Sequence, residues 1–191
     1  ATFAMEAYAN DPCEYFVPKI APENSTYNDK TLRLISQMHK AITIIQFKLE
    51  AAAILRHPEF EMNDRMLLHH IDFKRKVFQL DGKDYEMRDC LFPTVDPEHP
   101  YQLTEEEQEI VEKLHNSFTG SEKLRKHMKC LFRYGCMYNV CNSNLLFHAS
   151  MPMNADGTLK EVNILGQNYK GEALLKRVGQ LIRTAYFAED D

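Results

Sequence analysis

His148 lies where an apolar run ends, and it is the residue of this sequence best placed to do chemistry. It follows Asn-Leu-Leu-Phe at residues 144–147, and small residues come after it. The run before it is separated from an earlier β-prone run by Asn142-Ser143-Asn144, and turn residues between such runs predict a β-hairpin within residues 136–152. A histidine at the end of a buried strand stands where a functional site could be. From the residues alone, a ligand and an ordinary packing histidine both stay open.

Other groups of histidine and cysteine have simpler structural explanations. Four residues could be drawn together as a zinc site: His127, Cys130, Cys136 and Cys141. No Cys-x-x-Cys pair occurs, however, and the spacings match no zinc pattern, so reduced, buried thiols are the better interpretation. Adjacent His69 and His70 would point about 100° apart on a helix and cannot easily share one ion.

Two charged stretches also have an electrostatic explanation. The acidic residues 105–109 open a predicted helix, where the helix dipole favours carboxylates, although a metal-binding cluster is the alternative. The predicted helix before the hairpin carries a set of basic residues: Lys123, Arg125, Lys126, His127, Lys129 and Arg133. Cations suit the C-terminal part of a helix, and a phosphate-facing patch leading into the histidine hairpin is the alternative.

Composition narrows the classes of protein that this chain could represent. It has 191 residues, 44% of them hydrophobic and 27% charged, with five cysteines and a net charge of −5. These values are ordinary for a globular domain, and the acidic balance disfavours a nucleic-acid partner. No apolar run approaches the ~20 residues that span a bilayer, and no signal peptide is recognisable, so we expect a cytoplasmic protein without a membrane partner. The missing initiator Met suggests a piece of something longer.

The first two-thirds of the chain is predicted to be mainly helical. Residues 1–27 contain three prolines within eleven residues and are expected to be an extended segment. Residues 28–56 form the strongest helical pattern, and a shorter helix is predicted over 63–71. The apolar stripe of the long helix is predicted from its spacing: Leu32, Ile35, His39, Ile42, Ile45 or Gln46, Leu49 and Ala53. His39 in this stripe is better explained by a core or boundary position than by ligand binding.

Turns and helix caps divide the remainder. Residues 76–87 predict a hairpin with a type I′ turn at Asp81-Gly82. Thr104 and Glu107 form a capping box for the next helix, and Ser121 can cap the one after it. A strand is expected over 159–165, a loop over 166–171 and a closing amphipathic helix over 172–187. The predicted division is therefore 1–27, a helical part over 28–135, and strands with a closing helix over 136–191.

Common enzyme motifs are missing, but several blocks resemble a known family. There is no phosphate-binding loop, no dinucleotide fingerprint and no His-Glu-x-x-His. Blocks at residues 41–50, 56–60, 81–83, 121–124 and 135–152 resemble, in this order, the middle region of class III fructose-1,6-bisphosphatases. That family belongs to the calcineurin-like metallophosphoesterases, which are α/β sandwiches around a two-metal centre.

The resemblance implies a role for one residue only. Asn144-Leu145-Leu146-Phe147-His148 matches the superfamily block in which an apolar strand ends in a metal-binding histidine, so it implies that His148 is a metal ligand. Ala149 stands where the superfamily usually has Gly. The blocks that supply the other ligands, Asp-x-His, Gly-Asp-x-x-Asp-Arg, Gly-Asn-His-Asp/Glu and Gly-His, are absent from these 191 residues. Catalytic and substrate-binding residues are therefore not assigned.

For the whole protein, the resemblance implies a sugar bisphosphatase of gluconeogenesis. It would remove the 1-phosphate of fructose 1,6-bisphosphate by water attack, with divalent metal, preferably Mn²⁺, as cofactor. Control by small-molecule effectors and homo-oligomer formation are further implications. The fold would be an α+β segment, mainly helical at first and with β-hairpins, forming about the middle third of the enzyme and part of its sandwich. We expect this segment alone to be inactive. The alternative is a non-catalytic helical module for regulation or interaction.

Overall fold

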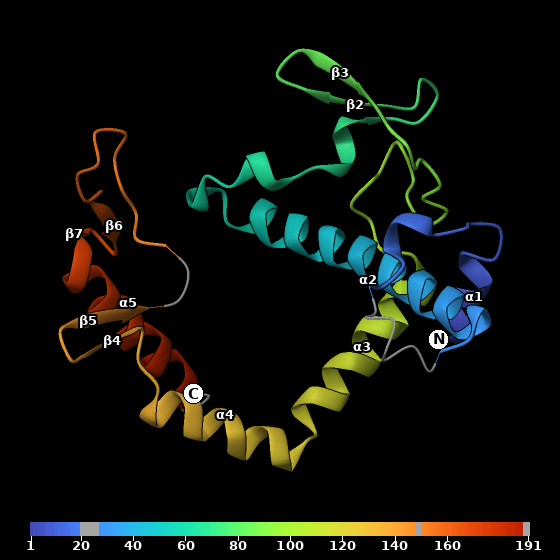
Figure 1. Ribbon diagram of the computed structural model, residues 1–191. Coiled ribbons are helices and arrows are strands. Elements are labelled where there is room, and N and C mark those ends of the chain that lie inside the picture. The colour runs from blue at the N-terminus through green and yellow to red at the C-terminus, as the bar shows by residue number, and fades with distance from the viewer. Residues whose placement is uncertain (20–26, 148–149, 189–191) are drawn as a thin grey trace. The chain divides into compact units, whose positions relative to one another are not determined.

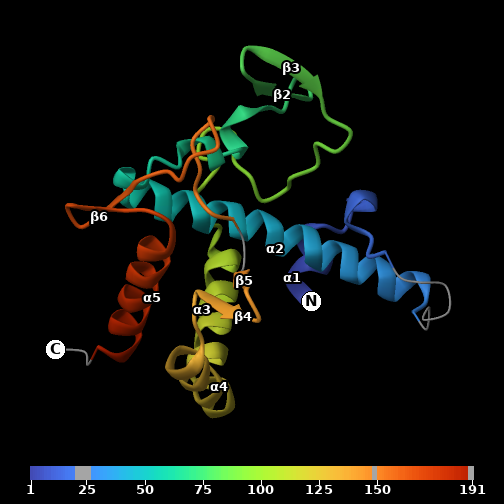
Figure 2. The same ribbon diagram turned by 60° about the vertical axis from the view of Figure 1, so that its left-hand side comes forward.

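The chain folds as an α+β structure in two separately packed units. The computed structural model describes residues 1–19, 27–147 and 150–188 (Figures 1 and 2). These residues contain five α-helices and three small antiparallel sheets. The units are Ala1–Leu114 and His115–Asp191. Packing thus places residues 115–135 with the second unit, whereas the predicted division fell after residue 135. The assignment of residues 136–191 to a catalytic sandwich stays a prediction.

The first unit is built around α2, Asp29–Arg56. The Asn28 side chain accepts a hydrogen bond from the Thr31 backbone N–H at 2.9 Å, so it is Asn28 that caps the helix start. The helix ends before His57-Pro58, as expected where a proline follows. Around it lie α1 (Thr2–Ala7), a three-stranded sheet whose first strand packs against the Ile44 cluster, and the start of α3 (Glu105–Thr119). The strands are β1 (Ile71–Asp72), β2 (Val77–Leu80) and β3 (Lys83–Glu86).

The buried face of α2 differs from the predicted stripe. The predicted positions Ile42, Leu49 and His39 are exposed. The residues that are buried instead lie about one position away around the helix: Ser36, Gln37, Lys40, Ala41, Ile44, Ile45, Lys48, Ala51 and Ile54. Two lysines on this face are neutralised by carboxylates far away in sequence, and the prediction, which counted apolar residues only, missed them. Ile45 alone belongs to both sets.

Two further expectations for the first unit are corrected by the structure. The N-terminal segment is not wholly extended, because α1 forms there and packs against α2, with Ala4, Tyr8 and Cys13 in a buried cluster. The helix predicted over 63–71 is replaced by short 3₁₀ turns, Asn63–Arg65 and Leu68–His70, followed by β1. Met66 between these turns has an extended backbone, and this breaks the helical pattern.

The predicted Asp-Gly hairpin is confirmed. β2 pairs with β3 from Val77↔Glu86 to Leu80↔Lys83, which leaves Asp81 and Gly82 as the turn. Their φ angles, 50° and 72°, are both positive, as a type I′ turn requires.

The second unit contains two helices and two separate hairpins. Its helices are α4 (Glu122–Tyr134) and α5 (Gly171–Phe187), which contact each other. Its strands are β4 (Tyr138–Cys141), β5 (Asn144–Phe147), β6 (Val162–Ile164) and β7 (Gln167–Tyr169). The region expected to be a loop at 166–171 therefore supplies β7. In the described residues of this unit, the four strands form two separate hairpins and do not join into one sheet. No helix among the described residues has the length and apolar character to cross a bilayer.

Candidate functional sites

The hairpin predicted to present His148 is formed. β4 and β5 pair from Tyr138↔Phe147 to Cys141↔Asn144, and Asn142-Ser143 make a two-residue turn with φ of 49° and 63°. Cross-strand partners share a face of a sheet, so Tyr138, Val140, Leu145 and Phe147 lie on one apolar face. His148 itself lies outside the described residues, and its role as a metal ligand stays a prediction.

The segment after the hairpin forms a closed turn beside an open hollow. Met153 and Leu159 form a bridge, and the turn between them is tied by hydrogen bonds among Asn154, Asp156 and Thr158. The hollow has a volume of about 870 Å³ and is open to solvent. Its lining combines polar and apolar surface: Asn154, Gly157, Thr158, Leu159, Lys160, Glu161 and Lys170. Because two of these residues are lysines, the hollow can take an anionic ligand.

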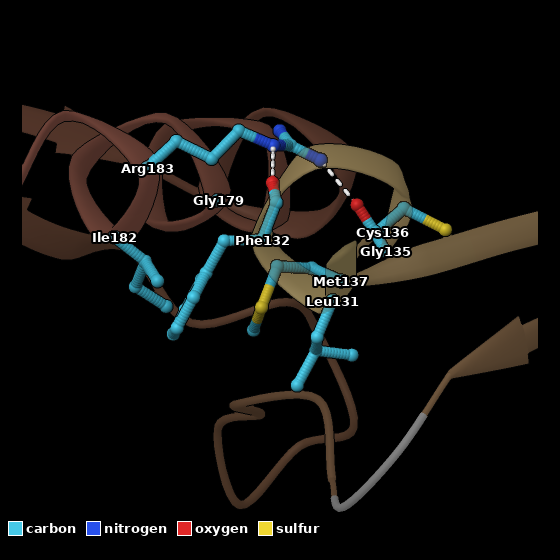
Figure 3. Close-up of a pocket in the computed structure, with 8 residues that line it drawn as sticks. All are labelled: Leu131, Phe132, Gly135, Cys136, Met137, Gly179, Ile182 and Arg183. Carbon is cyan, nitrogen blue, oxygen red and sulfur yellow. Dashed lines mark hydrogen bonds between the residues drawn. The ribbon is translucent and has the colours of Figure 1, made fainter. Parts of the chain in front are cut away.

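A smaller, apolar cavity of about 210 Å³ lies between α4 and α5 (Figure 3). Arg183 spans its side, donating hydrogen bonds to the backbone carbonyls of Phe132, at 3.1 Å, and Gly135. These bonds satisfy backbone carbonyls at the C-terminal end of α4, which have no N–H partner within the helix. Gly179 permits the close approach of α5 to the Met137 side chain, because a Cβ added at Gly179 would lie 3.2 Å from a Met137 side-chain carbon. With its guanidinium engaged in this way, Arg183 joins the two helices and the cavity offers mainly apolar contact.

One buried polar cluster of the first unit is centred on Lys40. Its ammonium, with no exposed area, donates to Asp11 at 2.5 Å and to both carboxylate oxygens of Asp89 at 2.8 and 2.7 Å. The ring of Phe92 lies 4.8 Å from the ammonium. Burial, together with neighbouring Asp11, raises the pKa of Cys13 to about 12, so this thiol stays protonated. The cluster fastens the N-terminal segment and the Asp89 loop to α2.

A second buried pair joins α2 to the start of α3. The Lys48 ammonium donates to Glu107 at 2.7 Å and to the backbone carbonyl of Thr94 at 2.6 Å. The predicted capping box is confirmed, since Glu107 accepts from the Thr104 N–H at 2.9 Å and the Glu107 N–H donates to the Thr104 hydroxyl at 3.2 Å. Glu107 is fully buried, and its second oxygen, Oε1, has no partner among the described residues. Burial also raises the pKa of nearby Tyr8 to about 12.

The other candidate ligands are dispersed. Cys130, Cys136 and Cys141 are all exposed free thiols, contrary to the buried thiols that we expected. The exposed His69 has its Nδ1 atom 2.6 Å from the Tyr101 hydroxyl, and partial burial lowers its pKa, so a local hydrogen bond accounts for this histidine. Within the ranges that the structure describes, no three His, Cys, Asp or Glu side chains are grouped to hold a metal ion. The described residues therefore do not form a metal centre by themselves.

Sequence reasoning missed both buried lysines. Their signal was the spacing of Lys40, Ile44 and Lys48, which are four residues apart and so share a face of the helix with apolar neighbours. Their carboxylate partners lie 29 to 59 residues away in sequence. A lysine among apolar residues on a helix face is therefore predicted to be exposed unless the carboxylate that pairs with it is known.

Comparison with known proteins identifies relatives along the full length of this chain. The family model described as Firmicute fructose-1,6-bisphosphatase matches residues 1–191. Proteins named fructose-1,6-bisphosphatase class 3 are similar: 67% identical over 192 residues in Phocaeicola vulgatus, 65% over 191 residues in Bacteroides fragilis, and 52% over 191 residues in Clostridium acetobutylicum. Each alignment covers 100% of this chain. No solved structure matches the chain.

The chain spans 29% of the length of these relatives. The match nevertheless includes both buried lysine clusters, the His148 hairpin and the lysine-lined hollow, since it runs over all 191 residues. Such identity over the whole segment leaves no doubt about descent. This chain belongs to the class III fructose-1,6-bisphosphatase family.

Proposed function

We propose that the full-length protein containing this chain is a metal-dependent fructose-1,6-bisphosphatase. It hydrolyses the 1-phosphate of fructose 1,6-bisphosphate by water attack, as a cytoplasmic enzyme of gluconeogenesis. The observation that carries the proposal is the family match over residues 1–191, with 65–67% identity to relatives that bear this name. Control by small-molecule effectors and homo-oligomer formation stay predictions.

The proposed part of this segment in catalysis is to supply His148 as one metal ligand. The pairing of Tyr138 with Phe147 extends the β4–β5 ladder to the residue just before His148, which would hold the imidazole at a strand end. Neutral imidazole suits Mn²⁺, Fe or Zn²⁺. The chemistry supplied by two such ions is to bind a phosphate and activate water. We propose that the hairpins of 136–191 belong to the metallophosphoesterase sandwich and that the other ligands lie outside this segment.

His148→Ala in the full-length enzyme tests this role. We expect the loss of one ligand to lower the bound Mn²⁺ per protein and to reduce turnover at least 100-fold, because one missing imidazole weakens both metal affinity and activity. The measurements are metal content by mass spectrometry and phosphate release from fructose 1,6-bisphosphate. His127→Ala is the control, because His127 is an exposed histidine on α4. This variant should have the metal content and the turnover of the parent enzyme. Unchanged metal content and turnover in His148→Ala would remove His148 from the site.

A further inference from the structure

The hollow beside the turn at residues 154–158 has a lining suited to a phosphate group. Two of its lining side chains are positive, Lys160 and Lys170, and one is negative, Glu161. Within the described residues, no carboxylate lies within ion-pair distance of Lys160. Lys170 has a partner in Glu161 at 3.3 Å, but these side chains are 58% and 55% exposed. Such exposed pairs are weak, so the Lys170 ammonium is able to turn to a dianionic ligand.

The wall of the hollow is held in place by its own hydrogen bonds. The Asn154 side-chain amide donates to the Thr158 hydroxyl at 2.9 Å, and the Asn154 and Thr158 backbones pair at 2.8 Å. Thr158 in turn holds the Asp156 carboxylate with its N–H and its hydroxyl, at 2.9 and 2.7 Å. Asp156 is not among the lining residues. The backbone N–H of Lys160 donates to the Pro152 carbonyl at 3.0 Å, which fixes the base of one of the two lysines.

The second wall comes from the start of α5. Gly171 follows Lys170 with φ of 54°, a backbone conformation that glycine adopts without steric cost. A Cβ at Gly171 would lie 3.0 Å from a Leu159 methyl group, so the absence of a side chain lets Leu159 pack there. This contact keeps Lys170 next to the segment that carries Lys160. Lys160 and Lys170 thus both line one hollow, on segments that pack together.

The chemistry of a sugar bisphosphate requires an anion site of this kind. Only the 1-phosphate reacts, so the other phosphate must be held by groups that take no part in hydrolysis. Asn154, the first lining residue, follows His148 by six residues, which limits the distance between their Cα atoms to about 20 Å. We propose that Lys160 and Lys170 bind the non-reacting 6-phosphate of fructose 1,6-bisphosphate. This inference rests on the proposed function and extends it to a residue-level phosphate site.

Lys160→Met and Lys170→Met in the full-length enzyme test the site, since Met keeps much of the side-chain volume without the charge. Each change should raise KM for fructose 1,6-bisphosphate about tenfold, because a charge-assisted contact is lost. For fructose 1-phosphate, which lacks the second phosphate, kcat/KM should stay within about twofold of the parent value. Lys113→Met is the matched control, since Lys113 is likewise exposed and paired with a glutamate. It should leave both substrates unaffected.

Calorimetric binding of fructose 6-phosphate separates this inference from the proposed function. The ligand carries only the non-reacting phosphate, and its affinity should fall about tenfold in each lysine variant. A parent enzyme that releases no phosphate from fructose 1,6-bisphosphate overturns the proposed function, while the binding assay still decides the phosphate site. Unchanged affinity for fructose 6-phosphate, or equal losses on both substrates, overturns the assignment of Lys160 and Lys170.

Discussion

At the scale of single residues, the burial of Lys48 and Glu107 has a large energetic consequence. Neither side chain has exposed area, and Lys48 also satisfies the Thr94 carbonyl. An ion pair removed from water gains little net free energy, but removal of one partner leaves an unpaired buried charge, which costs about 3–5 kcal/mol. Glu107 is identifiable from sequence as the N3 residue of a capping box that begins at Thr104. Its second function, as counter-ion to Lys48, depends on a residue 59 positions earlier and has no local signature.

Lys48→Met in the full-length protein should therefore destabilise the start of α3 by about 3 kcal/mol. Hydrogen exchange of the backbone amides at the start of α3, residues 105–109, measures the loss as faster exchange. Glu107→Gln added to Lys48→Met should restore part of the protection, because the unpaired charge is then removed while Gln can still serve the capping box. Lys113→Met, which removes an exposed pair with Glu109, is the control and should change exchange little. A double variant no better protected than Lys48→Met would contradict this account.

At the scale of elements, local signals located the ends of helices and the turns better than the buried faces. Thr104 and Ser121 cap the helices that they were predicted to cap, because a cap involves residues only three apart. The stripe of α2 was wrong because burial there is decided by distant carboxylates. The β6–β7 hairpin was missed because its turn, Leu165-Gly166, has leucine at φ of 51°, where Asn or Asp is usual.

The β4–β5 turn carries a related local cost that can be removed. Ser143 has φ of 63° at the second turn position, where Gly is preferred, and the left-handed region costs a non-glycine residue about 1 kcal/mol. Ser143→Gly in the full-length enzyme should therefore slow hydrogen exchange of the amides in residues 138–147 by about fivefold. Ser143→Ala is the matched control, since alanine pays the same backbone cost. Exchange that slows equally in both variants would show that the turn is not the source of the effect.

At the scale of the whole molecule, the two units differ in how much apolar surface they bury. Among the described residues, the buried hydrophobic side chains belong to the first unit, apart from Leu174. In the second unit the apolar face of β4–β5 is open, with Val140 61%, Leu145 50% and Phe147 41% exposed. A two-stranded hairpin with an open face is marginally stable in water at best. The chain spans 29% of its relatives' length, so we infer that the rest of the full-length polypeptide covers this face.

The 191-residue chain expressed alone should consequently show a divided pattern of hydrogen exchange. Amides of α2 should be protected as well as in the full-length enzyme, because their core lies within residues 1–114. Amides of β4–β5 should exchange at least tenfold faster in the isolated chain, because the hairpin there lacks the contacts that cover its apolar face. A tenfold change corresponds to a loss of about 1.4 kcal/mol in the free energy of local opening. The isolated chain should also release no phosphate from fructose 1,6-bisphosphate with Mn²⁺, because one histidine cannot hold the metal. Equal protection of β4–β5 in both proteins, or Mn²⁺-dependent phosphate release by the isolated chain, would show that this segment completes its own fold or its own site.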